Sequence, residues 1–343
     1  MDYSKELLET IVKICSKGKG ILAADESTGT IGKRFSQIDV INNLENRIRY
    51  RKLLFTTSKL NNHISGVITF DETLRNKDLV KPLLDSDIVL GIKLDKGVRS
   101  LYLNGETVSQ GLDGLEDRCK EYYNLGARFA KWRSVLKIDN NCPSDLSINQ
   151  NAEVLARYAS ICQKNGLVPI VEPEILMEGA HDIVKCSEVT ENVLSVVYRK
   201  LMEHRVNLET TLLKPNMVRP GVDNKNKSLD DIAYYTIRTL RRVVPVAVPG
   251  IMFLSGGMSE EQASEALHKL NIEKGHKPWY LSFSYGRALQ YSVLMAWRGD
   301  DNNIIKAQDE LIKRCKLNGL ATLGMYREEN ERGKSLHIDN YSY

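Results

Sequence analysis

Short apolar segments recur along the whole chain, and each one ends on polar residues. The segments are six to eight residues long, rich in β-branched side chains and punctuated by glycine or proline, which favours buried strands over pieces of helix. Eight of them occur: GILAAD (20–25), ISGVITFD (64–71), IVLGIKLD (88–95), ARFAKWR (127–133), LVPIVEPE (167–174), TTLLKP (210–215), GIMFLSGG (250–257) and WYLSFSYG (279–286).

Amphipathic stretches with helical periodicity lie between these segments. We predict helices at 44–60, 115–125, 149–164, 187–204, 229–242, 259–270 and 286–298. Strands that alternate with helices form βαβ units and a parallel sheet, which makes this an α/β protein. Eight repeats fit a closed TIM (β/α)8 barrel better than an open doubly wound sheet, which is the alternative fold.

The chain shows no linker or low-complexity block that would divide it. We predict a single barrel domain over residues 1–325, which carries the chemistry. The last stretch, YREENERGKSLHIDNYSY (326–343), is polar and without periodicity, so we predict a flexible C-terminal tail.

Composition and charge exclude several classes of protein. The 343 residues carry 48 Lys and Arg against 44 Asp and Glu, a net charge of +4, which argues against a dedicated nucleic-acid binder. The six cysteines form no C-x-x-C pair and the six histidines no H-x-x-x-H pair, so we predict neither a metal site nor a redox motif. The N-terminus lacks an apolar leader, and no stretch is long enough to span a membrane; we therefore expect a cytoplasmic protein.

Polar residues at the ends of the predicted strands are the candidates for a site, because a barrel of this kind builds its active site at the carboxyl ends of its strands. They are Asp25, Asp71, Lys93, Lys131, Arg133, Glu172, Glu174, Lys214, Ser255, Gly256, Gly257, Ser284 and Arg287. Residues two apart on a strand share a face, so Lys131 and Arg133 are expected to point the same way, as are Glu172 and Glu174.

Lys131 and Lys214 stand in otherwise apolar segments, where a permanent charge is costly unless it is paired. Desolvation and a second nearby cation lower the pKa of a lysine, and its free amine can then attack a carbonyl to form a Schiff base. Glu172 or Glu174 could move the protons that this step requires, with Asp25 as a further such group. The alternatives are that each lysine reaches solvent or makes a structural ion pair, and that the glutamates only neutralise neighbouring cations.

Two clusters suggest phosphate recognition. The segments LSGG and SYGRA follow strands seven and eight, the recurrent phosphate site of this fold, and Arg287 could add a bidentate contact. Lys33 and Arg34, with Lys93 and Arg133, could hold a second phosphate, unless Lys33 and Arg34 only begin a solvated helix.

The motifs GKGILAADEST, GIKLDKG, QGLDGL, ARFAKWR, LARYASICQ, VPIVEPEIL, TLLKPNMV, FLSGG and FSYGRAL occur in this order, and together they closely resemble class I fructose-1,6-bisphosphate aldolases. The resemblance runs from about residue 18 to Tyr343. It implies reversible cleavage of fructose-1,6-bisphosphate to dihydroxyacetone phosphate and glyceraldehyde-3-phosphate, in glycolysis and gluconeogenesis, without a metal or other cofactor.

The resemblance also implies a role for individual residues. Lys214 would form the Schiff base, Glu172 would serve as its general acid and base, with Glu174 beside it, and Lys131 would lower the pKa of Lys214. Asp25 would polarise the C4 hydroxyl. By the same resemblance, the ketose phosphate is held by Ser255, Gly256, Gly257, Ser284, Gly286, Arg287 and Arg34. The other phosphate is held by Lys93, Arg133, Ser27 and Thr30, near Lys33. Arg47 is a further basic position, and Tyr343 reaches the site from the tail to protonate the enamine.

Two other functions remain as alternatives. A transaldolase or deoxyribose-phosphate aldolase would use the same Schiff-base chemistry, but its substrate carries one phosphate where this chain has two basic clusters. Binding of actin or a cytoskeletal adaptor is a side role of aldolases and would not need Lys214, Glu172 and Asp25. The resemblance further implies a homotetramer.

Overall fold

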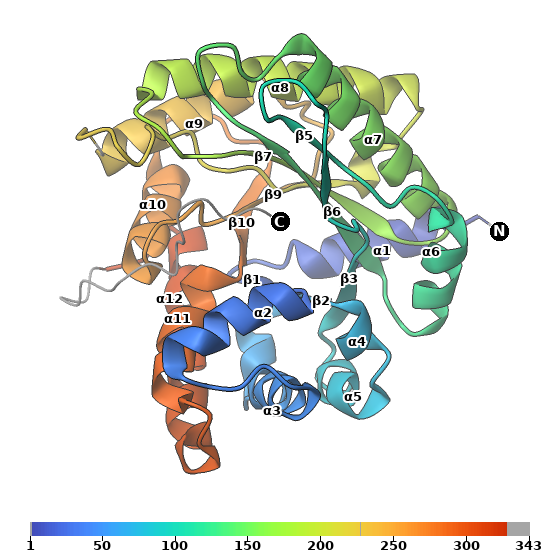
Figure 1. Ribbon diagram of the computed structural model, residues 1–343, viewed down its shortest axis with the longest axis vertical. Helices are drawn as coiled ribbons and strands as arrows, with labels where there is room; N and C mark the ends of the chain where they lie inside the picture. The colour runs from blue at the N-terminus through green and yellow to red at the C-terminus, as the bar shows by residue number, and fades with distance from the viewer. Residues whose placement is uncertain (1, 227, 328–343) are drawn as a thin grey trace.

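The computed structural model describes residues 2–226 and 228–327 and forms a closed barrel (Figure 1). In this part of the chain the barrel strands are hydrogen-bonded in the order β1-β10-β9-β8-β7-β6-β3-β2 and are all parallel. They are β1 (Gly20–Ala24), β2 (Ile64–Thr69), β3 (Val89–Lys93), β6 (Phe129–Leu136), β7 (Val168–Ile175), β8 (Leu212–Leu213), β9 (Gly250–Phe253) and β10 (Tyr280–Tyr285). The eight predicted strands are confirmed. Pairing of Ile21 with Ser284 joins the last strand to the first, so the open-sheet alternative is wrong.

The helices form a ring around the barrel. Neighbouring helices pack in sequence from α7 through α8, α9 and α10 to α12, and α11 and α3 pack against α12. The seven predicted helices are present as α3 (Leu44–Phe55), α6 (Leu115–Asn124), α7 (Asp145–Lys164), α8 (Ile183–Glu203), α9 (Leu229–Val243), α10 (Glu260–Ile272) and α11 (Arg287–Trp297). Five further α-helices of the described residues were not predicted from the sequence: α1 (Ser4–Ile14), α2 (Thr28–Phe35), α4 (Asp71–Leu74), α5 (Lys77–Asp85) and α12 (Ile304–Thr322).

Helix α1 closes the amino end of the barrel. Its Leu7, Ile11 and Ile14 pack on the inward side chains Ile21 and Phe129, and this inner core is separate from the larger core between the strands and the outer helices. Because this end is filled with apolar side chains, polar groups inside the barrel are placed at the opposite end.

Side chains alternate in direction along a strand, and this places a layer of polar side chains next to the inner core, on its carboxyl side. Phe129 and Ile170 point inward, so Lys131 and Glu172, two residues further along, point inward as well. Phe129 fits because Gly66 and Gly91 have no side chains: a Cβ at Gly91 would lie 2.3 Å from the Phe129 ring. The inner faces of β6 and β7 therefore change from apolar to polar toward their carboxyl ends.

A hairpin of β4 (Val98–Ser100) and β5 (Thr107–Ser109) follows β3 and pairs antiparallel, outside the barrel sheet. Ser109 is buried and its hydroxyl donates to the carbonyl oxygen of Arg133, which fastens the hairpin to β6.

The predicted tail lies almost entirely outside the described residues, which end at Arg327. Tyr326 is buried, and its ring lies 6.1 Å from that of His268 on α10. In the described ranges, no helix is both long and apolar enough to cross a bilayer.

Candidate active site

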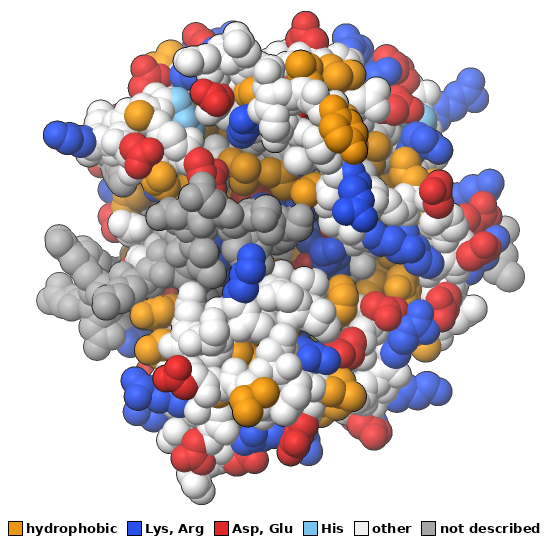
Figure 2. Space-filling model, viewed as in Figure 1, with side chains coloured by type: hydrophobic (Ala, Val, Ile, Leu, Met, Phe, Trp, Pro, Cys, Tyr) orange, Lys and Arg blue, Asp and Glu red, His pale blue; other side chains and the backbone are white. Residues whose placement is uncertain are grey.

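A cavity of about 750 Å³ opens at the carboxyl end of the barrel. Figure 2 shows Lys and Arg side chains around the hollow in the middle of this face. Most of the predicted site residues line the cavity: Asp25, Ser27, Thr30, Lys33, Arg34, Lys93, Lys131, Arg133, Glu172, Glu174, Lys214, Ser255, Gly256, Ser284, Gly286 and Arg287. The strand ends therefore bring together residues that are up to 262 positions apart in the sequence.

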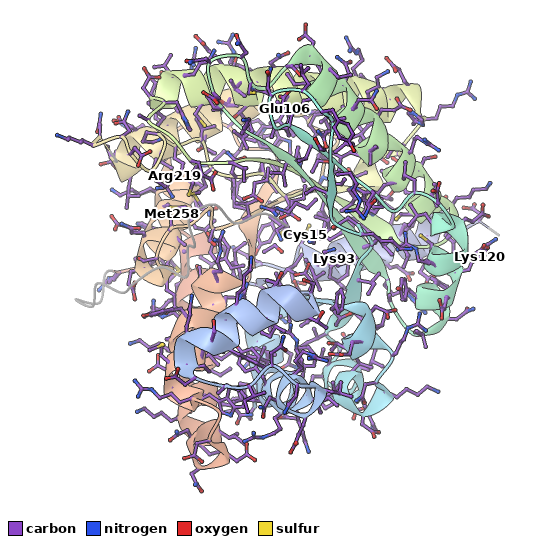
Figure 3. The ribbon with its side chains drawn as sticks, in the orientation of Figure 1. Cys15, Lys93, Glu106, Lys120, Arg219 and Met258 are labelled. Atoms are coloured by element: carbon purple, nitrogen blue, oxygen red, sulfur yellow. The ribbon has the colours of Figure 1, made fainter. Side chains whose placement is uncertain are left out.

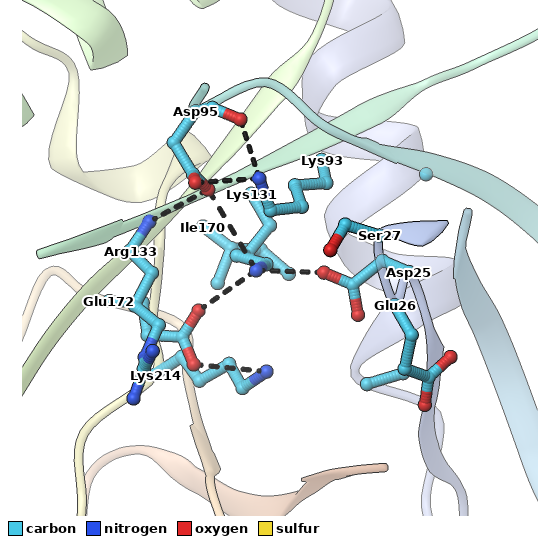
Figure 4. Close-up of polar contacts among 12 residues, drawn as sticks. Asp25, Glu26, Ser27, Lys93, Asp95, Lys131, Arg133, Ile170, Glu172 and Lys214 are labelled. Atoms are coloured by element: carbon cyan, nitrogen blue, oxygen red, sulfur yellow. Dashed lines mark hydrogen bonds and ion pairs between the residues drawn. The ribbon is translucent and has the colours of Figure 1, made fainter. Parts of the chain in front are cut away.

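The carboxylate of Glu172 lies between the two lysines (Figure 4). One oxygen, Oε1, is 3.2 Å from Lys214 Nζ, and the other, Oε2, is 3.5 Å from Lys131 Nζ. All three side chains are buried, so water screens these interactions weakly. An amine next to a carboxylate that can exchange its proton is the arrangement that imine formation requires.

Lys131 is the centre of a larger network. Its Nζ lies 2.7 Å from Asp25 Oδ2 and 3.9 Å from Asp95 Oδ2, in addition to Glu172. Burial disfavours the charged amine, but the charges of Asp25, Glu172 and Asp95 outweigh it and raise the pKa of Lys131. The raised pKa favours the charged ammonium form of Lys131 at neutral pH, which is not nucleophilic.

Asp25 is an ionised carboxylate in this network. Burial would raise its pKa, yet the positive charges of Lys131 and Lys214 hold the pKa well below its usual range. Asp25 follows β1 and faces the cavity, so it is placed to accept a proton from a hydroxyl group.

Glu174 has a different partner from Glu172. It accepts a hydrogen bond from Nε of Arg133 on the adjacent strand β6. Burial opposes its ionisation, but Arg133 lowers the pKa of Glu174 below its ordinary value. The structure thus separates the two carboxylates that the sequence left equivalent: Glu172 contacts Lys214, and Glu174 holds Arg133.

Backbone amides and polar side chains meet at the ends of β9 and β10. Ser255 and Gly256 follow β9, and Gly256 has φ +54°, a left-handed conformation that favours glycine. Gly286 is the N-cap residue of helix α11, and the amide groups of a helix N-terminus that lack helical partners attract anions. The Oγ of Ser284 is buried and has no hydrogen-bond partner among the described residues, so it is available to a bound oxyanion.

Arg34 reaches the same place from helix α2. A Cβ at Gly286 would lie 3.5 Å from Arg34 Nη2 and 3.2 Å from the Ala23 carbonyl oxygen. Arg34 is held by Glu26, which also lies 2.5 Å from Nη2 of the buried Arg51. Burial opposes ionisation of Glu26, but these two arginines lower its pKa.

The residues of the second predicted phosphate region also line the cavity. Ser27 caps α2, where its hydroxyl accepts from the Thr30 amide at 3.3 Å. Lys93 Nζ lies 2.7 Å from Asp95 Oδ1. Burial would raise the pKa of Asp95, but Lys93 and Lys131 lower it.

Among the described residues, two predicted positions do not line the cavity. Arg47 forms a bidentate ion pair with Glu72, with both hydrogen bonds 2.8 Å long, and does not line the cavity. Gly257 follows Gly256 in the sequence and is not one of the residues that line the cavity. Tyr343 lies outside the described residues.

The sequence reading missed Glu26, Arg51 and Asp95. Asp95 ends the segment IVLGIKLD, and Glu26 follows Asp25, so both stood at strand ends and the same rule could have found them. Arg51 lies on α3 in a strongly charged stretch, which carries no such signal. Within residues 2–226 and 228–327, no group of three or more His, Cys, Asp or Glu side chains could hold a metal ion.

Known proteins resemble this chain over almost its whole length. The family model described as Glycolytic, Fructose-bisphosphate aldolase class-I, matches residues 6–343. Fructose-bisphosphate aldolase 4, cytosolic, of Arabidopsis thaliana is 55% identical over 98% of this chain and 89% of that protein. The cytoplasmic isozyme 2 of Pisum sativum is 55% identical over 99% of this chain and 98% of that protein. These names confirm the prediction of a cytoplasmic location.

A solved structure has the same fold. Fructose-bisphosphate aldolase from Plasmodium falciparum, in complex with TRAP and a small-molecule inhibitor, superposes with a TM-score of 0.94 at 53% identity. The match covers 96% of this chain and 97% of the other.

Proposed function

The chain belongs to the class I fructose-bisphosphate aldolases, and from this premise we propose that Lys214 is the amine that forms the imine with the substrate. The protein is a glycolytic aldolase, a carbon–carbon lyase of a family that acts without a metal. Its substrate is fructose-1,6-bisphosphate, and the products are dihydroxyacetone phosphate and glyceraldehyde-3-phosphate. The observation that carries the assignment of Lys214 is its 3.2 Å contact with Glu172.

Imine formation follows from this contact. The amine of Lys214 attacks the C2 ketone, and the carbinolamine loses water when Glu172 transfers a proton to its hydroxyl. Lys131 stays charged beside the other oxygen of Glu172. The product is a protonated imine, which can accept an electron pair.

Cleavage then needs a base at the C4 hydroxyl. Asp25 removes that proton, the C4–O electrons form the aldehyde, and the C3–C4 bond breaks as its electron pair moves into the iminium to give an enamine. The aldehyde leaves, the enamine is protonated at C3, and water releases the second triose from Lys214. Protonation at C3 by Tyr343 remains a prediction.

The two ends of the substrate carry phosphates, and the cavity offers cationic groups for both. Ser255, Ser284, Gly286 and Arg34 are proposed to bind the ketose phosphate, because amide groups, a buried hydroxyl without a partner and an arginine converge there. Lys93 and Arg133 are proposed for the other phosphate.

Borohydride trapping tests the nucleophile. The protein is incubated with dihydroxyacetone phosphate, reduced, digested and analysed by mass spectrometry, both with and without excess EDTA. We expect a reduced triose-phosphate adduct on the peptide that contains TLLKPNMV, with no effect of EDTA. Lys214→Met should abolish the adduct, whereas the exposed Lys306→Met should retain it. An adduct on another lysine, or none with the folded wild-type protein, contradicts the assignment.

Two predictions concern partners. The comparisons support the catalytic function and not the cytoskeletal alternative, in which actin or an adaptor would bind. We infer a homotetramer from the family resemblance. Light scattering of the purified protein tests it: a mass near four times 38.9 kDa is expected, and a monomer contradicts it.

A further inference from the structure

Arg219 is a buried arginine that the proposed reaction does not use. Arg219 belongs to the loop after β8 and is 8% exposed. Among the described residues, Arg219 forms no ion pair with an Asp or Glu, and its Nε has no hydrogen-bond partner. A buried charge without a counter-ion is costly and stays in a protein only where something offsets the cost.

The backbone that carries Arg219 is firmly held. The loop after β7 and the loop after β8 are joined by bonds from Gly221 N to His181 O at 2.9 Å and from Val222 N to Met177 O at 2.7 Å. Just before Arg219, Val218 N donates to Thr236 Oγ1 on α9 at 2.8 Å. A Cβ at Gly221 would lie 2.1 Å from the Gly179 carbonyl oxygen, so the two loops are in close contact.

The guanidinium reaches from this frame to the loop after β9. Nη1 of Arg219 donates to the carbonyl oxygen of Gly256 at 2.9 Å. In Figure 3, Arg219 lies near Met258, which follows Gly256 by two residues. Met177, from the loop after β7, packs on the same glycine, where a Cβ would lie 3.0 Å from its Cε.

This contact constrains the amides next to it. A peptide unit is planar and trans, so fixing the Gly256 carbonyl also fixes the N–H of Gly257 in the opposite direction. Gly256 lines the cavity and Arg219 does not, so the charge stands directly behind the cavity wall at the proposed ketose-phosphate site. A cation with no carboxylate partner among the described residues attracts an anion there through a poorly solvated wall.

We propose that Arg219 is a positioning residue for the ketose phosphate, which orients the Ser255–Gly257 loop through the Gly256 carbonyl and adds its positive charge behind it. This inference rests on the proposed function, because it assumes that the loop binds the phosphate of a Lys214 imine. The phosphate of dihydroxyacetone phosphate is then the group whose binding depends on Arg219, and the imine chemistry itself does not.

Borohydride trapping with two ligands separates these effects. Trapping rates are measured against the concentration of dihydroxyacetone phosphate and of dihydroxyacetone, which has no phosphate. In Arg219→Met the apparent dissociation constant for dihydroxyacetone phosphate should rise about tenfold, as expected when a hydrogen bond from a charged group is lost. The trapping rate with dihydroxyacetone should stay at the wild-type value. Arg238→Met, at a partly exposed arginine on α9, is the matched control and should change neither.

Two further variants keep the test decisive if the methionine variant does not fold. Arg219→Lys retains the charge and should recover most of the affinity for dihydroxyacetone phosphate, whereas Arg219→Gln retains a donor without charge and should recover less. Wild-type affinity in the neutral variants, or an equal loss with both ligands, overturns the proposal. Failure of the wild-type protein to trap either ligand would instead refute the assignment of Lys214.

Discussion

Lys131 Nζ lies 2.7 Å from Asp25 Oδ2 and so connects strand β6 to the end of strand β1 across the mouth of the barrel. Lys131 is buried and the Asp25 side chain is only 12% exposed, and each stabilises the charged form of the other against the effect of desolvation, which raises the pKa of Lys131 and lowers that of Asp25. The pair therefore keeps a cation and an ionised base side by side at neutral pH.

Replacing the cation should disturb the base. In Lys131→Met the pKa of Asp25 should rise, because burial is then opposed mainly by the weaker influence of Lys214. A higher pKa leaves less ionised carboxylate at a given pH, so the acid limb of kcat/KM should move to higher pH, with activity reduced about 100-fold or more. Rates of cleavage from pH 4 to 9 measure this. Lys120→Met, an exposed lysine on α6, is the control, and an unmoved acid limb contradicts the prediction.

Asp25→Asn should separate the two halves of the reaction. Without a base at the C4 hydroxyl, cleavage of fructose-1,6-bisphosphate should fall by about 10²- to 10⁴-fold. The contact of Lys214 with Glu172 remains, so borohydride should still trap dihydroxyacetone phosphate. Both measurements are made on one preparation, and loss of trapping along with cleavage would show that Asp25 acts on the imine itself.

Glu26→Gln should destabilise the fold. Glu26 pairs with Arg34 and Arg51, and its neutralisation leaves the buried Arg51 without its carboxylate. Removing one partner of such a buried pair costs about 3–5 kcal/mol. Urea unfolding at pH 7 measures the loss. Glu203→Gln, at an exposed ion pair on α8, should be nearly silent, and equal stability of the two variants rules out this role for Glu26.

Glu260 should make stability depend on pH. It is 3% exposed, and burial raises its pKa to about 7, although Arg314 opposes the shift. A carboxyl with a raised folded-state pKa stabilises the fold fully below its unfolded pKa of 4.5 and loses that contribution as pH rises through 7.

Glu260→Gln removes this titration because the amide is neutral at every pH. The variant should gain stability relative to wild type between pH 4.5 and pH 8, by up to about 3 kcal/mol for a shift of this size. Thermal unfolding of both proteins across this range gives the difference. A constant difference would mean that Glu260 ionises normally or is paired more strongly by Arg314 than burial allows.

The strands could be predicted because their apolar segments are short, β-branched and regularly spaced, and because each ends on polar residues. Helices α1 and α12 were not predicted because neither lies between two barrel strands, and the alternation of strands and helices predicts only the helices between strands. The hairpin β4–β5 was missed because its strands have only three residues each and are largely outside the core.

The site could be predicted in composition but not in pairing. Register on adjacent strands places Lys93 opposite Lys131 and Arg133 opposite Glu172, yet the side-chain contacts run differently, from Lys131 to Asp25 and from Arg133 to Glu174. A pattern along one strand shows which face a side chain occupies, and it cannot show which of several inward charges will meet.

By itself, the sequence determined the barrel and the polar layer at its mouth, because a period of two along each strand gives every inward residue the same face. Only the tertiary structure decided that Glu172 contacts Lys214 while Glu174 holds Arg133, that Arg51 pairs with Glu26, and that Arg47 is turned to Glu72. It also placed Arg219 behind Gly256. These choices depend on distances between strands and loops that closure of the barrel sets, and on the cost of burying a charge without a partner.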